Sequence, residues 1–165
     1  MMRLMLLMMM IAVVLPVAAY DTALVKVGEA KLKVLFWDVY NSTLYSDDGR
    51  YREGQLPLRL DVQYLLDIES EALVTRTAQE WDALGLEHEN RDEWLLSLSA
   101  LWPDVNKNDV LTIELDDNKR STFYRNGELL GTIEDSAFGT SFIAIWLSPN
   151  STRPTLRAAL TGSTN

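Results

Sequence analysis

The residues best placed to do chemistry lie in one apolar stretch, residues 34–45, which reads VLFWDVYNSTLY. Asp38 is its one acidic residue, and by strand alternation it shares a face with Phe36 and Tyr40. It therefore either lines a cleft or lies in the core, where a carboxylate must be paired or protonated. Two interpretations stay open: Asp38 accepts a proton or holds a ligand, or it pairs structurally with a basic residue or with the amides of a bulge.

The chain has few of the residues that form metal or cofactor sites. His88 is the single histidine, and the chain has no cysteine to supply a thiolate ligand. Acidic pairs such as Asp47 and Asp48 lie in turn-like stretches without the spacing of a calcium loop, and no glycine-rich phosphate loop is present. We therefore expect no metal and no cofactor, and we expect His88 to lie in a solvated loop.

Large aromatic side chains of the chain together supply more apolar surface than hydrogen-bonding groups. They either fill the core or line an apolar pocket of the kind that holds a small molecule. The residues in question are Trp37, Tyr40, Tyr45, Tyr64, Trp81, Trp94, Trp102, Phe138, Phe142 and Trp146.

The aromatic and acidic residues described above must be positioned by a single domain. Its hydrophobic pattern alternates between the period of strands and that of helices. Residues 31–45 alternate with apolar side chains on both faces, which predicts a single strand covered on both sides. The stretch 109–135 predicts an antiparallel meander with a tight turn at Asn126 and Gly127. The other expected elements are a strand at 58–64 and helices at 70–85, 90–103, 138–146 and 154–162. This order predicts an α+β domain with helices packed on an antiparallel sheet.

Residues 1–19 have the layout of a secretory signal peptide, with Arg3, a short apolar core, Pro16 and a small residue at Ala19. We place the cut before Tyr20, so that residues 20–165 form the mature domain, exported to the periplasm. An uncleaved anchor stays open as the alternative, although the apolar core is short for a membrane span. The net charge of −9 argues against nucleic acid or anionic membrane as the main partner.

Three segments resemble one family of proteins. They are VGEAKLKVLFWDVYNSTLY, LRLDVQYLLDIESEALVTRTAQEW and FYRNGELLGTIEDSAFGTSFIAIWLSPNSTRPTLRAAL, and they look like the chalcone isomerase-like proteins of bacteria. That family includes plant chalcone isomerases, which close a flavonoid ring, and plant fatty-acid-binding proteins with the same fold and no isomerase activity. The resemblance implies an open-faced β-sandwich, a sheet covered by helices with a ligand cleft between them.

The resemblance also implies where a site would lie. The plant enzymes use an arginine before the long strand, a threonine within it and a tyrosine near the next helix start. This chain has Lys31 or Lys33, Tyr40 and Glu71 at those places, so isomerase activity is not carried over. Fatty-acid binding needs only a cation and a hydroxyl at an apolar cleft, which implies Lys31, Tyr40 and the neighbouring Trp37 as ligand-binding residues.

The main hypothesis is therefore an exported, non-catalytic protein that binds a small apolar or amphipathic ligand such as a fatty acid. One alternative is an isomerase or lyase of the same family with Asp38 or Tyr40 as its proton-transfer group, so the question of enzyme activity stays open and leans to none. Another is a protein-interaction module that uses its acidic surface or the RNGELLG hairpin. The oligomeric state is not predicted.

Overall fold

Six strands with alternating apolar residues form one sheet in the computed structural model, which describes residues 23–163. The predicted signal peptide and its cleavage point lie outside the described residues. In chain order the elements are β1 (Val25–Val34), β2 (Trp37–Ser46), β3 (Leu58–Tyr64), α1 (Ser70–Ala83), α2 (Arg91–Leu101), β4 (Val110–Leu115), β5 (Ser121–Arg125), β6 (Glu128–Ile133), α3 (Phe138–Leu147) and α4 (Pro154–Thr161).

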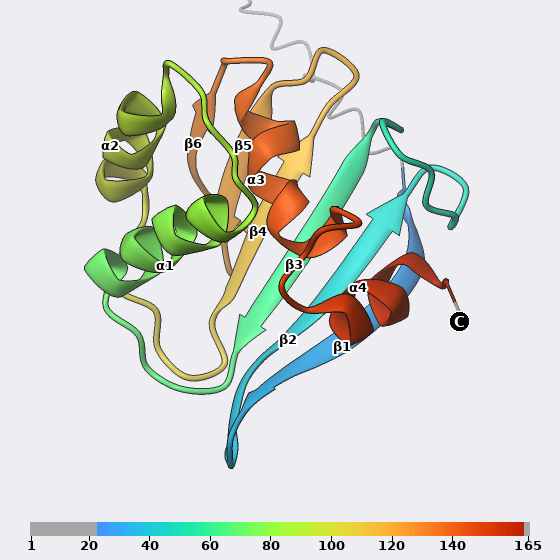
Figure 1. The fold of residues 1–165 in the computed structure, drawn as a ribbon, viewed down its shortest axis with the longest axis horizontal. Coiled ribbons are helices and arrows are strands. Elements are labelled where there is room, and N and C mark those ends of the chain that lie inside the picture. The colour runs from blue at the N-terminus through green and yellow to red at the C-terminus, as the bar shows by residue number, and fades with distance from the viewer. Residues whose placement is uncertain (1–22, 164–165) are drawn as a thin grey trace, which may run out of the picture.

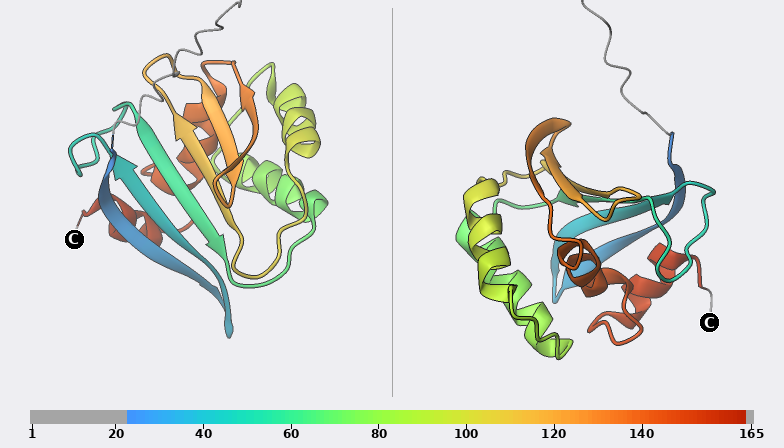
Figure 2. Two further views of the ribbon diagram at one scale, coloured as in Figure 1. Left: turned by 180° about the vertical axis from the view of Figure 1, so that it is seen from behind. Right: turned by 90° about the horizontal axis from the view of Figure 1, so that it is seen from above.

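The strands pair in the order of the chain, from β1 to β6, and every neighbouring pair is antiparallel. The helices gather on one side of the sheet, while the opposite face is free of helices in the described part (Figures 1 and 2). A sheet covered on one face in this way is an open-faced β-sandwich, and the predicted α+β class is confirmed.

The prediction of one long strand over residues 31–45 is wrong. The chain turns back at Leu35 and Phe36, so that this stretch contains the end of β1, a two-residue turn and most of β2. Leu35 has a positive φ of 54°, and Phe36 is 99% exposed. The expectation of two covered faces fails here because the apolar run continues through a turn that no other part of residues 23–163 covers.

Aromatic side chains join the helices to one another in the core. Trp81 of α1, Trp94 of α2 and Phe138 of α3 meet edge to face, with ring centroids 5.7–6.5 Å apart. The Nε1 of Trp81 donates to the carbonyl of Ser141 at 2.9 Å, and that of Trp94 donates to the Asp135 carboxylate at 2.9 Å. These three rings fill the core, as one of the two interpretations of the aromatic surplus expects.

Helix α4 lies across β1 and β2 (Figure 1), and a glycine allows it to approach closely. A Cβ added at Gly28 would lie 2.3 Å from the carbonyl oxygen of Ala159 and 2.6 Å from that of Leu160. Both atoms belong to the backbone and cannot swing aside. Gly28 therefore sets the distance between α4 and the edge of the sheet.

The β5–β6 hairpin has the predicted turn at Asn126 and Gly127, both with positive φ. Residues 23–163 contain no helix with the length and apolar character that crossing a membrane requires.

Candidate functional site

An apolar cavity of about 340 Å³ lies between the sheet and the helices. Its floor is the inner face of β3 and β4, where Leu60 pairs with Ile113 and Val62 pairs with Leu111. Strand alternation sends these four side chains to the same face. The wall is completed by residues of β1, β2, α1, α3 and α4 and of the segment between β3 and α1, among them Leu32, Val34, Val39, Ile68, Leu73, Ile145 and Leu156.

Charged residues line one part of this apolar cavity. Arg76 and Glu80 of α1 form an ion pair, and the hydroxyl of Thr152 donates to the second Glu80 oxygen at 2.8 Å. Arg153, just before α4, also lines the cavity, and its guanidinium has no ion-pair partner among residues 23–163. Two arginines against one carboxylate leave a positive charge beside the cavity, which favours an anionic ligand group.

Tyr40 of β2 lies close to this charged group. Burial raises the pKa of its phenol to about 12, which outweighs the hydrogen bond from Trp146 and the nearby charge of Arg153, both of which lower the pKa. Trp146 Nε1 donates to the Tyr40 oxygen at 3.0 Å. Tyr40 thus stays protonated at neutral pH, and with Trp146 as its donor its own O–H remains to donate to a ligand.

A second phenol supports Tyr40. Tyr64 of β3 pairs across the ladder with Tyr40, and the two rings meet edge to face at 6.1 Å. Burial raises the pKa of Tyr64 as well. The pair and Trp146 hold the Tyr40 ring in one orientation at the cavity wall.

Of the ligand-binding residues predicted from the sequence, Tyr40 is the one that lines the cavity. Lys31 lies on the surface with its Nζ 3.0 Å from an Asp38 oxygen, and Trp37 is 71% exposed beside the turn. Neither side chain is part of the cavity lining.

Asp38 lies neither in the cleft nor in the core. The β1–β2 register shifts between the pairs Leu32–Tyr40 and Lys33–Asp38, so Val39 is an extra residue in β2. Such a bulge reverses the alternation, which separates Asp38 from Tyr40. The ammonium groups of Lys31 and Lys33, at 3.0 and 3.2 Å, lower the Asp38 pKa. This is the structural pairing that the sequence left open.

Sequence reasoning missed Arg76, Glu80 and Arg153 as site residues. The first two stand four residues apart on α1, a spacing that could have indicated an ion pair on one helix face. Arg153 offered no such signal, because only the fold brings it next to α1 and β2.

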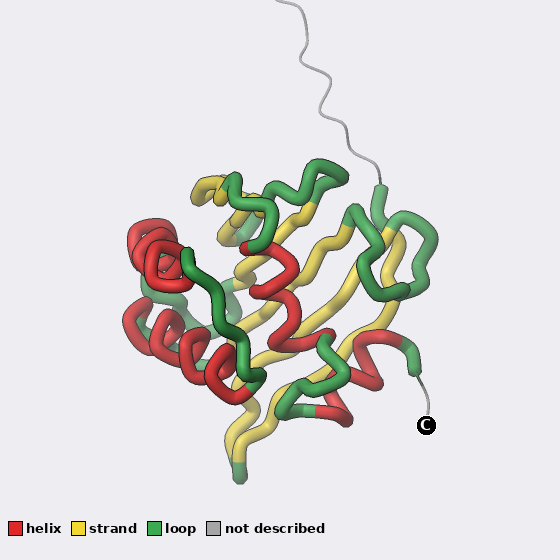
Figure 3. Tube along the Cα trace, turned by 45° about the horizontal axis from the view of Figure 1, so that its top comes forward, coloured by secondary structure: helices red, strands yellow, loops and turns green. Residues whose placement is uncertain are grey.

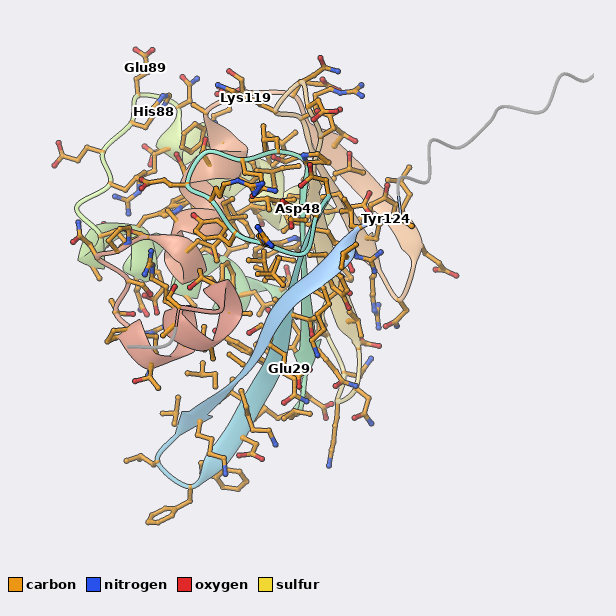
Figure 4. All side chains as sticks on the ribbon, turned by 90° about the vertical axis from the view of Figure 1, so that its right-hand side faces the viewer. Glu29, Asp48, His88, Glu89, Lys119 and Tyr124 are labelled. Atoms are coloured by element: carbon orange, nitrogen blue, oxygen red, sulfur yellow. The ribbon has the colours of Figure 1, made fainter. Side chains whose placement is uncertain are left out.

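His88 lies in the loop between α1 and α2, at the end of the molecule opposite the β1–β2 hairpin (Figure 4). It is half-buried rather than solvated, because its ring stacks on Trp94 with centroids 4.4 Å apart. Within residues 23–163, no group of three or more His, Cys, Asp or Glu residues could hold a metal ion.

The fold and the cavity define an open-faced α+β protein with an apolar site between its sheet and its helices. The sequence model of the chalcone isomerase-like family matches residues 16–162, and the chain belongs to this family.

Two similar proteins illustrate the family and the fold. An uncharacterized protein of Haemophilus influenzae is 34% identical over 139 residues, which is 84% of this chain and 68% of that protein. The crystal structure of an Arabidopsis thaliana fatty-acid binding protein superposes with a TM-score of 0.64, covering 84% of this chain and 86% of that one. At 14% identity, this second similarity concerns the fold alone.

Proposed function

We propose that this chain is an exported, non-catalytic binding protein for a single amphipathic carboxylic acid such as a fatty acid. Export rests on the signal-peptide layout of residues 1–19, and the periplasm is the proposed compartment. The observation that carries the ligand proposal is the apolar cavity with Arg153, Arg76 and Tyr40 at its wall.

The charges and hydrogen-bond groups suit a carboxylate. Arg76 is held by Glu80, whereas the guanidinium of Arg153 has no ion-pair partner in the described part of the chain. The planar fork of an arginine binds two carboxylate oxygens at once, which a lysine cannot do. The Tyr40 O–H adds a third donor beside the same charged group. In this proposal Arg153 replaces Lys31 as the ligand's cation.

The volume suits a small amphipathic ligand. A cavity of about 340 Å³ lies within the size range of pockets that hold small molecules. It has room for an alkyl chain, so dodecanoate, an acid of medium length, is a suitable test ligand. The similarity in fold to a fatty-acid binding protein of Arabidopsis thaliana supports the same ligand class.

Membership of the chalcone isomerase-like family is the reason to consider an isomerase. However, Asp38 and Tyr40 are poorly suited to transfer a proton. Asp38 is paired with two lysines on the surface, with a lowered pKa. Tyr40 has a pKa of about 12 and is not a base near neutral pH. The binding proposal requires neither group to transfer a proton.

Calorimetric titration with dodecanoate tests the proposal on protein purified from the exported fraction after expression of the full precursor. We expect one dodecanoate per chain. Arg153→Gln should weaken its binding about 10- to 100-fold, the effect of losing hydrogen bonds to a charged group. Binding of dodecanol, which lacks the carboxylate, should be little changed in the same variant.

Arg50→Gln is the matched control, because it removes the same charge from an exposed loop residue that does not line the cavity. If both substitutions weakened dodecanoate binding equally, the net charge of the protein and not a carboxylate contact would be responsible. If Arg153→Gln had no effect, the proposed orientation of the ligand would be wrong.

A further inference from the structure

Four consecutive apolar residues form the exposed end of the β1–β2 hairpin. We call Val34, Leu35, Phe36 and Trp37 the apolar tip; Leu35 is 87%, Phe36 99% and Trp37 71% exposed. The hairpin extends beyond the helices and the rest of the sheet (Figures 1 and 3). Single exposed apolar residues are common, but a contiguous group on a projecting turn indicates a contact surface.

The turn itself is built at some cost in stability. Leu35 has a positive φ of 54°, a region in which a side chain crowds the backbone. The other two-residue turn of this sheet, at Asn126 and Gly127, has residues suited to positive φ. The same chain thus has one hairpin turn whose residues favour positive φ and another, at the tip, with an unfavourable and apolar residue there.

The apolar tip is continuous with the cavity. Val34 is both part of the tip and part of the cavity lining, together with Leu32 and Val39 of the same hairpin. Basic residues flank the tip, since Lys31 and Lys33 share the single carboxylate of Asp38 and leave one positive charge. Apolar and aromatic side chains followed by lysines match the boundary between lipid tails and phosphate groups.

We propose that the apolar tip docks this protein reversibly on the surface of a lipid bilayer. Two aromatic and two aliphatic side chains offer on the order of 600 Å², less than the roughly 800 Å² per partner of a stable protein interface. A lipid bilayer, unlike a protein partner, does not need a surface shaped to fit the tip. Narrow projecting side chains can insert between its lipids. Because the whole chain carries a net charge of −9, the bilayer that it fits has neutral headgroups, and the apolar side chains supply the attraction.

Flotation with phosphatidylcholine vesicles tests the docking. The exported protein is used, after its mass has shown that residues 1–19 are absent, so that the leader cannot cause the binding. Wild type should float with the vesicles. Phe36→Ser and Leu35→Ser should each lower the partition coefficient about tenfold or more, as expected from losing the burial of one large apolar side chain.

Leu96→Ser is the matched control, because Leu96 of α2 is 72% exposed and lies outside the tip. It should leave flotation unchanged. Lipid with bromine in its tails should quench Trp37, since Trp81, Trp94, Trp102 and Trp146 are buried. An unchanged unfolding temperature in Phe36→Ser would show that the variant folds.

Three results would overturn the docking: no flotation of wild type at excess lipid, equal losses in Leu35→Ser and Leu96→Ser, or self-association that Leu35→Ser abolishes without any vesicle binding. The third result would make the tip a contact between copies of this chain. The docking does not rest on the proposed ligand, because the vesicle assay contains no fatty acid and Arg153→Gln should float as wild type does. Failure of one proposal can thus be told from failure of the other.

Discussion

Leu60 and Leu58 lie two residues apart on the same face of β3, but only Leu60 lines the cavity. Both are buried, at 1% and 3% exposure. A larger side chain at Leu60 can occupy part of the cavity, whereas at Leu58 it must displace packed neighbours. Leu60→Trp should therefore change the free energy of unfolding by less than about 1 kcal/mol, and Leu58→Trp should lower it by about 2–3 kcal/mol.

Urea unfolding of the two variants beside wild type measures this difference. In a domain of this size, 2–3 kcal/mol corresponds to a fall of about 6–9 °C in the unfolding temperature. Leu60→Trp should also weaken dodecanoate binding because the larger side chain takes up part of the cavity, while Leu58→Trp, if folded, should bind as wild type does. Equal destabilisation by both substitutions would refute the argument, since it would mean that no usable space lies beside Leu60.

Further predictions concern packing and pH. Gly28→Ala should lower the free energy of unfolding by about 2 kcal/mol or more, measured in urea, because its Cβ would lie 2.3 Å from the Ala159 carbonyl. A hydrogen bond from the Asn106 amide, together with other donors, lowers the pKa of Asp109 to about 2. The contribution of the Asp109 carboxylate to stability is therefore present above about pH 4 and is lost as the pH falls toward 2. In Asp109→Asn, the free energy of unfolding should change less between about pH 4 and pH 2 than in wild type. Burial raises the Tyr40 pKa to about 12, so the contribution of this phenol to stability is complete below about pH 10 and is lost as the pH rises through 12. In the ultraviolet titration, Tyr40→Phe should have one late-titrating phenol fewer, while the buried phenol of Tyr64, whose pKa is also raised, remains.

Most of the fold could be predicted because its signals are local. Trp94 and Leu98 recur at helical spacing and are both buried in α2, and Asn126 and Gly127 form the turn that their types favour. The architecture then follows from packing helices with one apolar stripe on an antiparallel sheet.

The apolar tip could not be predicted from such signals. Leu35 and Phe36 have no turn preference, and an apolar run ordinarily indicates burial. The bulge at Val39 has no sequence signature either, yet it decides that Tyr40 faces the cavity and Asp38 does not. The turn at Leu35 and Phe36 and the bulge at Val39 both interrupt the alternation, and only the strand pairing reveals them.

The polar part of the site was missed for a different reason. Its residues come from β2, α1 and the start of α4, and Tyr40 is separated from Arg153 by more than half of the chain. No spacing rule links residues so distant in sequence. The resemblance to a family directed attention to lysines near the long strand, whereas the structure has arginines on the helix side of the cavity.

Native mass spectrometry of the exported protein with dodecanoate tests the central claim most directly. The account predicts one bound dodecanoate per chain, weakened by Arg153→Gln and by Leu60→Trp and unchanged by Arg50→Gln. The absence of any adduct with wild type, or an adduct that persists undiminished in Leu60→Trp, would contradict the proposal that this cavity binds a fatty acid.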